Sequence, residues 1–190
     1  MRVLIAGGVA GGIVGAGCVL AVRGALTVDL GVGRRTTELG PLRATIDAAP
    51  DAVFDVIAGP YLGRTPRAMA SKLRVLEQGS DMVVAAHFTP IGALTATTIE
   101  SVRFERPHRI SFRLLRGPVP YVTEAFALVD AGGRTEFTYT GELGTDFWRM
   151  GQWWGHTVAA RWERAVQQSI TSIKADAERR HIPSRASGSG

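Results

Sequence analysis

Alternating apolar and polar positions dominate the middle of the chain, from Lys72 to about Gly144. Apolar residues recur at every second position in three segments, which contain Ile110/Phe112/Leu114, Val122/Phe126/Leu128 and Phe137/Tyr139/Leu143. This period places one face of each strand in the core and the other in water. Short connections separate the segments, so the pattern predicts an antiparallel meander. The expected strands are residues 42–47, 73–77, 82–88, 94–104, 109–115, 122–129 and 135–143.

Helical periodicity occurs on both sides of these strands. Pro50 at a first helical turn and Gly59 after the last predict a short helix. Residues 64–69 favour a second short helical piece. Asp146 suits the N-cap of a long final helix that runs to about Arg180. The apolar stripe of that helix, at steps of three or four, is Phe147, Met150, Trp154, Val158, Trp162 and Ala165.

The first segment of the chain has a different pattern. Val3 to Val22 contains 20 residues without a charged or strongly polar side chain, and arginines bound it on both sides. A helix of this length spans the hydrocarbon core of a bilayer, so we expect a transmembrane anchor at residues 1–23. Glycines at small-xxx-small spacing suit a homodimer through this helix, but glycine-rich padding in a single anchor is the simpler explanation. The expected membrane residues include Val3, Gly7, Gly11, Gly15 and Val22.

Three other interpretations of this segment stay open. Residues 3–11 are similar to a strand entering a dinucleotide-binding glycine loop, but Ala6 stands where the first glycine belongs. A cleaved signal peptide normally has a shorter apolar run and a clear cleavage site. A lipoprotein signal ending at Cys18 needs an aliphatic residue where Gly15 stands. For the membrane anchor, the arginines that follow it favour a single-pass protein with a cytoplasmic domain.

Composition divides the chain into four parts. We expect the anchor at residues 1–23, a linker at 24–41, one soluble domain at 42–180 and a disordered tail at 181–190. The 190 residues are 45% hydrophobic and 21% charged, which suits one folded domain. Much of the net charge of +5 comes from residues 1–43, with five arginines and two acidic residues. Because the folded domain lacks this excess, the sequence argues against a nucleic-acid partner.

Several kinds of chemistry are excluded by residue types and spacing. Cys18 is the only cysteine, so there is no intrachain disulfide and no cysteine zinc site. The four histidines lie at least 21 residues apart, without the short spacing of a local metal site. The chain has no Gly-x-Ser-x-Gly nucleophile motif. We therefore expect neither a metal nor a cofactor.

Four segments carry a resemblance to a known superfamily. They are Ala44–Ile57, Thr123–Leu128, Gly133–Leu143 and the C-terminal helix. Over about residues 42–178 the chain resembles the START-like (SRPBCC) superfamily, in particular its polyketide cyclase/dehydrase and lipid-transport branch. The resemblance implies an α+β helix-grip fold, in which a curved antiparallel sheet wraps a long C-terminal helix and leaves a cavity between them. The N-terminal transmembrane helix lies outside the resemblance.

Candidate ligand-binding residues lie where the sheet and the final helix face each other. Glu124 shares the parity of Val122 and Phe126, so its side chain is expected to point inward, where a carboxylate needs a partner. We expect Arg161, at the edge of the helix stripe, to pair with it. The alternatives are a bulge that turns Glu124 outward and a purely structural ion pair. The candidate set is Phe112, Glu124, Phe126, Tyr139, Trp154, His87 and Arg161, with space left by Gly141, Gly151 and Gly155.

Two functions agree with these residues. The first is a membrane-anchored domain that binds a hydrophobic small molecule or lipid in an internal cavity, without catalysis. The alternative is an enzyme of the cyclase or dehydratase type that uses Glu124 as acid and base, with His87 or Tyr139 as partner. A third possibility, a domain that only binds a protein partner, requires a filled interior.

Overall fold

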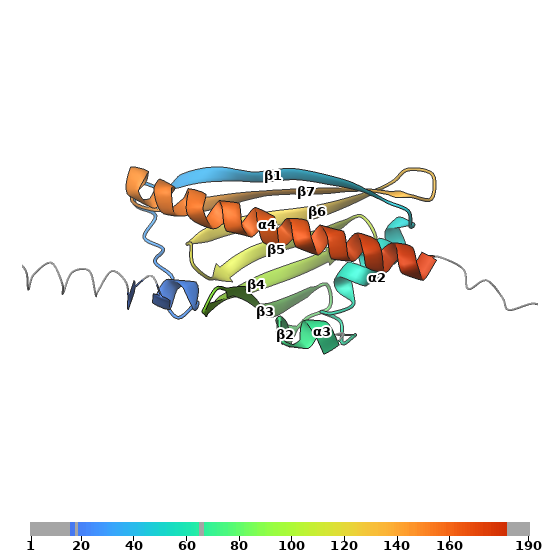
Figure 1. Ribbon diagram of the computed structural model, residues 1–190, viewed down its shortest axis with the longest axis horizontal. Coiled ribbons are helices and arrows are strands. Elements are labelled where there is room, and N and C mark those ends of the chain that lie inside the picture. Colours follow the sequence, from blue (N-terminus) through green and yellow to red (C-terminus); the bar gives the residue numbers. More distant parts are fainter. Residues whose placement is uncertain (1–15, 18, 65–66, 182–190) are drawn as a thin grey trace, which may run out of the picture.

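The computed structural model describes residues 16–17, 19–64 and 67–181, which form an antiparallel sheet and helices on one of its faces (Figure 1). Every predicted strand is present, and β1 begins at Arg35 rather than at residue 42. In chain order the elements are β1 (Arg35–Ile46), α2 (Pro50–Ala58), α3 (Arg67–Ala70), β2 (Leu73–Gln78), β3 (Met82–Ile91), β4 (Leu94–Glu105), β5 (Arg109–Arg116), β6 (Tyr121–Asp130), β7 (Thr135–Thr145) and α4 (Trp148–His181).

The sheet has seven strands in the order β1-β7-β6-β5-β4-β3-β2. Consecutive strands from β2 to β7 pair as neighbours, while β1 lies beside β7 at the opposite edge from β2. Helices α2 and α3 connect these two edges, and α4 returns across the same face of the sheet (Figure 1). This arrangement confirms the predicted α+β helix-grip fold.

Helix α4 directs its apolar stripe toward the sheet. Trp154, Val158 and Trp162 pack against the core as predicted. Met150 does not, and is 73% exposed, because the first turn of α4 extends past the ends of the strands (Figure 1). The buried residues of α4 are Gly155, Val158, Ala159, Val166, Ile170 and Ala177.

Asp146, predicted as the N-cap of α4, instead binds the segment that precedes β1. Its carboxylate accepts hydrogen bonds from the amides of Leu30 and Gly31 at 2.7 and 2.9 Å and from Nε of Arg34 at 2.9 Å. The Asp146 side chain is 2% exposed, and the Arg34 guanidinium beside it lowers the pKa of this carboxyl. Because these donors fix the carboxylate, no amide of α4 bonds to it.

Residues 24–41, expected to form a linker, are largely part of the folded domain. Thr27 and Gly117 exchange two hydrogen bonds of 2.9 Å. Residues 35–41 form the first half of β1, which pairs with β7. Leu39 is only 1% exposed, so burial of its side chain in the core stabilises this early part of the strand.

The predicted single-pass membrane localisation is wrong on this structure. The described residues contain no helix that is both long and apolar enough to cross a membrane. Residues 19–22 are helical, but the chain then turns at Gly24, which packs so closely on Thr97 that a Cβ would lie 2.5 Å from its carbonyl oxygen. Val22 is half-buried, whereas the other residues on which the span and the homodimer contact were based lie outside the described residues: Val3, Gly7, Gly11 and Gly15.

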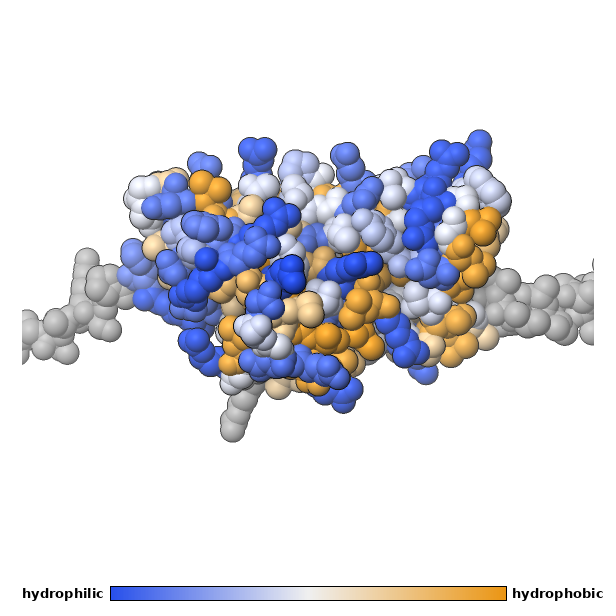
Figure 2. Space-filling model, turned by 180° about the vertical axis from the view of Figure 1, so that it is seen from behind, coloured by the Kyte–Doolittle hydropathy of each residue, from blue (hydrophilic) through white to orange (hydrophobic). Residues whose placement is uncertain are grey.

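The face of the sheet opposite α4 is turned to solvent. Figure 2 shows hydrophilic side chains over much of it, interrupted by apolar areas. This mixture agrees with the alternation that the strands show along the chain. Large exposed apolar residues also occur in the segment before β1, where they are Leu20, Leu26, Val28, Leu30 and Val32.

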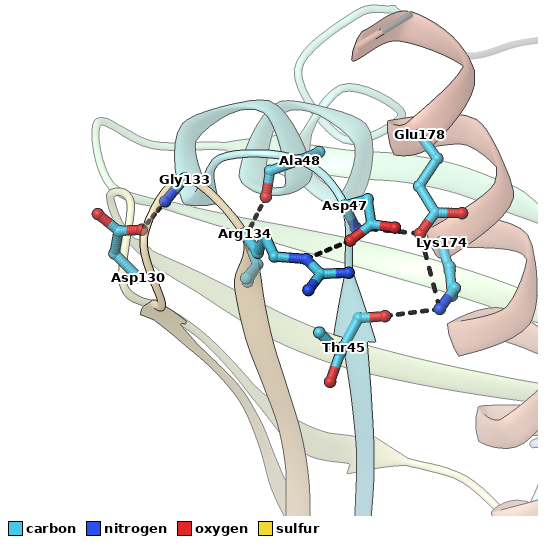
Figure 3. Close-up of polar contacts among 9 residues, drawn as sticks. Thr45, Asp47, Ala48, Asp130, Gly133, Arg134, Lys174 and Glu178 are labelled. Atoms are coloured by element: carbon cyan, nitrogen blue, oxygen red, sulfur yellow. Dashed lines mark hydrogen bonds and ion pairs between the residues drawn. The ribbon is translucent and has the colours of Figure 1, made fainter.

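Polar contacts join the end of α4 to the sheet (Figure 3). Lys174 donates from Nζ to the carbonyl oxygen of Thr45 at 2.6 Å. Glu178 accepts from the amide of Asp47 at 3.0 Å, and the Asp47 carboxylate pairs with Arg134 in the turn between β6 and β7. These contacts fix the last turns of α4 against β1. The helix ends at His181, and the rest of the predicted tail lies outside the described residues.

Candidate functional site

Glu124 lies on the face of β6 that α4 covers, as the parity of the strand predicts. It stands opposite Gly141 of β7, and Phe126 stands opposite Tyr139 in the same register. Gly141 allows this arrangement, because a Cβ there would lie 3.0 Å from the Cβ of Glu124 and 2.9 Å from a backbone oxygen. Gly141 therefore lets β7 lie close to Glu124. It does not leave the empty space that we expected from its small size.

Two donors bind the same oxygen of Glu124. The hydroxyl of Tyr139 donates to Oε2 at 2.8 Å, and the indole Nε1 of Trp162 donates to Oε2 at 2.7 Å. No hydrogen bond to Oε1 is present among the described residues. The expected pair with Arg161 does not form, because Arg161 is exposed and donates to the carbonyl oxygen of Thr157 in its own helix.

A second carboxylate, Glu100 on β4, lies in the same interior. The residue is 5% exposed, and its Oε1 accepts a hydrogen bond of 2.7 Å from the hydroxyl of Thr98. Glu100 is not among the predicted candidates, although the same signal is present in its strand. Glu100 has the parity of Val102, a core residue of the same strand, and the argument that turned Glu124 inward applies to it equally.

His87 of β3 connects Glu100 with the segment after α2. Its Nε2 lies 2.9 Å from the hydroxyl of Tyr61. Its Nδ1 lies 3.3 Å from Oε2 of Glu100, but the two atoms are not aligned as a hydrogen bond, and this buried nitrogen has no hydrogen-bond partner. His87 is therefore a polar residue of the interior with one unused nitrogen.

Burial sets the protonation of these groups. It raises the pKa of Glu100 to about 7, against the hydrogen bond from Thr98. Burial, and then the charge of Glu100, raises the pKa of Glu124 to about 7, although its two donors act in the opposite direction. Burial lowers the pKa of His87 to about 4, so this imidazole is neutral at pH 7. The pKa of Tyr61 and that of Tyr139 are both raised, mainly by burial.

Aromatic rings form a continuous row beside the polar groups. The ring of Phe126 lies 5.0 Å from that of Phe112 and 5.9 Å from that of Tyr139, and the ring of Tyr61 lies 6.3 Å from that of Phe112. Trp154 donates from Nε1 to the carbonyl oxygen of Pro118 at 2.9 Å, at the turn between β5 and β6. The structure thus places five of the named candidates in one interior, namely Phe112, Glu124, Phe126, Tyr139 and His87. Trp154 packs against the core and bonds to the β5–β6 turn, and Arg161 is on the outer side of α4.

The polar residues of this interior are not completely buried. Glu124 is partly exposed, and the side chain of His87 is 22% exposed, although buried core residues surround both. Gly151 leaves no hollow, because a Cβ there would lie 1.5 Å from the carbonyl oxygen of Asp146. An open depression of about 510 Å³ lies at the start of α4 and is lined by Arg35, Arg149, Gln152, Trp153 and His156.

We predict that Gly141→Ala destabilises the fold and disturbs Glu124. The added methyl group overlaps the Cβ of Glu124 and a backbone oxygen of β6, and overpacking of this kind costs about 1–3 kcal/mol. Urea denaturation followed by tryptophan fluorescence measures the effect. Thr140→Ala, at an exposed position of the same strand, is the matched control. Equal stability of the two variants would contradict the close packing around Glu124.

The arrangement suits proton transfer better than covalent chemistry. Two carboxylates with a pKa of about 7 exist in both protonation states near neutral pH, which is the range where a general acid or base works best. Oxygen Oε1 of Glu124 is the one atom of that carboxylate without a protein donor. The cluster contains no cysteine, lysine or serine that would act as an activated nucleophile.

Comparisons with known proteins agree with this architecture. The sequence profile of the family described as polyketide cyclase/dehydrase and lipid transport matches residues 42–178. The chain is similar to the solved Zhui aromatase/cyclase from Streptomyces sp. R1128, with 19% identity and a TM-score of 0.64 over 83% of this chain and 99% of that chain. At this identity the likeness shows the fold alone.

Two further solved structures share the fold. The di-domain aromatase/cyclase BexL of the BE-7585A biosynthetic pathway has 17% identity and a TM-score of 0.53, over 77% of this chain and 50% of that chain. Truncated norcoclaurine synthase from Thalictrum flavum has 14% identity and a TM-score of 0.55, over 80% of this chain and 95% of that chain. No functionally curated protein has a sequence that matches this chain significantly.

Proposed function

The chain belongs to the polyketide cyclase/dehydrase and lipid-transport family of the START-like (SRPBCC) superfamily, and from this premise we propose that it transfers protons on a hydrophobic small molecule. The family's description names cyclases, dehydrases and lipid transport, which all act on or carry hydrophobic small molecules. In this chain the interior between the sheet and α4 holds aromatic rings and two carboxylates. The similar aromatase/cyclase and norcoclaurine synthase structures, which share the fold, are enzymes by name.

The observation that carries the proposal is the state of Glu124. Tyr139 and Trp162 fix its Oε2, and Oε1 is left for a ligand. Burial keeps the pKa of the carboxyl at about 7. A general base needs this combination of a fixed position, a free oxygen and a pKa near the working pH.

The chemistry that follows is abstraction of a proton from carbon next to a carbonyl group. The C–H bond breaks, its proton moves to Oε1 of Glu124, and the electron pair passes to the carbonyl oxygen as an enolate. Glu124 then returns the proton to another position, or protonates a leaving hydroxyl group so that water departs. Cyclisation and dehydration of a polycarbonyl compound both consist of such steps.

We predict that the protein accelerates hydrogen exchange on an aryl ketone. In D₂O, the methylene protons of 2-naphthylacetone exchange through an enol or enolate, and NMR follows their loss. After subtraction of the buffer rate, the protein-dependent rate is expected to rise with pH and to level off above about 7, the pKa of Glu124.

Two results of this experiment would contradict the proposal. A ketone that binds without any exchange above the buffer rate identifies the protein as a carrier, the non-catalytic alternative that the same aromatic lining supports. If the ketone does not bind at all, the interior is not the ligand site.

A further inference from the structure

The interior holds two carboxylates and no cation to balance them. Glu100 and Glu124 are surrounded by core residues, and no lysine or arginine whose burial the structure describes is buried. His87 is the one basic group beside them, and burial lowers its pKa to about 4, so it carries no charge at pH 7. Buried charges in proteins are normally paired, since an isolated one is costly.

The two carboxylates lie on the same face of the sheet. Glu124 is on β6 and Glu100 is on β4, with only β5 between them in the sheet. Neighbouring strands are about 4.8 Å apart, and the two residues stand opposite positions of β5 that differ by two residues. Their backbones are therefore roughly 12 Å apart. The charge of each carboxylate is close enough for that of Glu100 to raise the pKa of Glu124. A small group placed over β5 can therefore contact both side chains.

The lining of the region over β5 suits a cation. Phe112 of β5 stands opposite Glu124, and Glu100 stands opposite Leu114, two residues along the same strand. The ring of Tyr61 lies 6.3 Å from that of Phe112. Aromatic faces attract ammonium groups, most strongly where water is excluded. The unpartnered Nδ1 of His87, 3.3 Å from Glu100, adds an acceptor or donor that nothing in the protein uses.

We propose that the ligand of this site is an aromatic amine whose ammonium group binds between Glu100 and Glu124. The inference rests on the proposed function and narrows it to one class of substrate. Glu100 acts as the counter-ion of the ammonium group, and Oε1 of Glu124 accepts the substrate proton. The ammonium group supplies the positive charge that the described interior lacks, and it favours the ionised form of Glu124 that a base requires.

A matched pair of probes tests this proposal. 2-Naphthylmethylamine and 2-naphthalenemethanol share their ring system and differ in a charged ammonium or a neutral hydroxyl group. Calorimetric titration at pH 7.5 is expected to show the amine binding at least about tenfold more tightly, as charge-assisted hydrogen bonds predict. In Glu100→Gln the preference is expected to fall to less than about threefold, because the counter-ion is gone. Glu105→Gln, an exposed position of the same strand, should keep the full preference.

The outcomes separate this inference from the proposed function. Equal affinity for the two probes in the wild-type protein overturns the amine proposal and leaves proton transfer on a neutral ligand intact. An amine preference that survives in both Glu100→Gln and Glu124→Gln also overturns it, because the ammonium group then binds elsewhere. If neither probe binds, the interior site itself is rejected, and both proposals fail.

Discussion

Replacement of Glu124 by glutamine is expected to slow protein-dependent deuterium exchange into 2-naphthylacetone by about 100- to 10,000-fold, the usual contribution of a general base. The glutamine side chain keeps the shape of glutamate, and its oxygen still accepts from Tyr139 and Trp162, which both bind one oxygen in the wild-type protein. An amide oxygen, however, does not take up a proton near neutral pH. Binding of the ketone should therefore persist while exchange is lost.

The matched control is Glu136→Gln, an exposed acidic position of β7. NMR exchange rates and calorimetric binding of the ketone are compared for the wild-type protein and the two variants at pH 8. If Glu124→Gln keeps more than half of the wild-type exchange rate, Glu124 is not the base. If the variant loses ketone binding as well, its carboxylate contributes to affinity in addition to proton transfer.

The second large effect is expected in the pH dependence of stability. Burial raises the pKa of Glu100 to about 7, well above that of a carboxyl in the unfolded chain. The folded state therefore holds its proton more tightly. The stabilisation from this tighter proton binding is fully present below the pKa of the unfolded carboxyl. It is lost as the pH rises through about 7, the pKa in the folded state. One carboxyl with this shift destabilises the folded state by about 3 kcal/mol at pH 8.5 relative to pH 4.5.

The comparison of Glu100→Gln with the wild-type protein measures this effect together with the coupled change at Glu124, whose pKa the charge of Glu100 raises. His87 has a lowered pKa and therefore gains stability between about pH 4 and 6.5, which offsets part of the loss in the wild-type curve. Because both proteins retain His87, the difference in their free energies of unfolding removes its contribution. Urea denaturation at several pH values measures the free energy of unfolding of both proteins. Between pH 4.5 and 8.5 the value for Glu100→Gln is expected to rise by about 3 kcal/mol relative to that of the wild-type protein. A constant difference would mean that Glu100 titrates normally in the folded state.

The fold was predictable because period-two alternation is a strong signal in this chain. The same alternation placed Glu124 in the interior, where the structure has it. The same parity would have placed Glu100 in the interior, but its closeness to Glu124 cannot be read along the chain, because β5 lies between their strands. Strand order brought the two carboxylates together, and that order depends on long-range contacts.

The partner of Glu124 shows the limit of helical patterns. Arg161 and Trp162 are adjacent on α4 but point about 100° apart, and small changes in the rotation of the helix decide which of them reaches the sheet. Charge complementarity favoured Arg161, whereas the structure places Trp162 against Glu124 and leaves Arg161 outside. The rotation follows from packing of the whole apolar stripe, which favours the indole over the exposed guanidinium.

The hydrogen bonds between Asp146 and the residues before β1 have a consequence for truncated proteins. The family profile begins at residue 42, inside β1 and after Leu30, Gly31 and Arg34, which satisfy this carboxylate. A fragment trimmed to the profile loses those donors and also the half of β1 that covers part of β7. The uncovered length of β7 becomes an edge that recruits strands from other molecules. If such a fragment aggregates, the cause is the loss of the first half of β1. The result would say nothing about ligand binding.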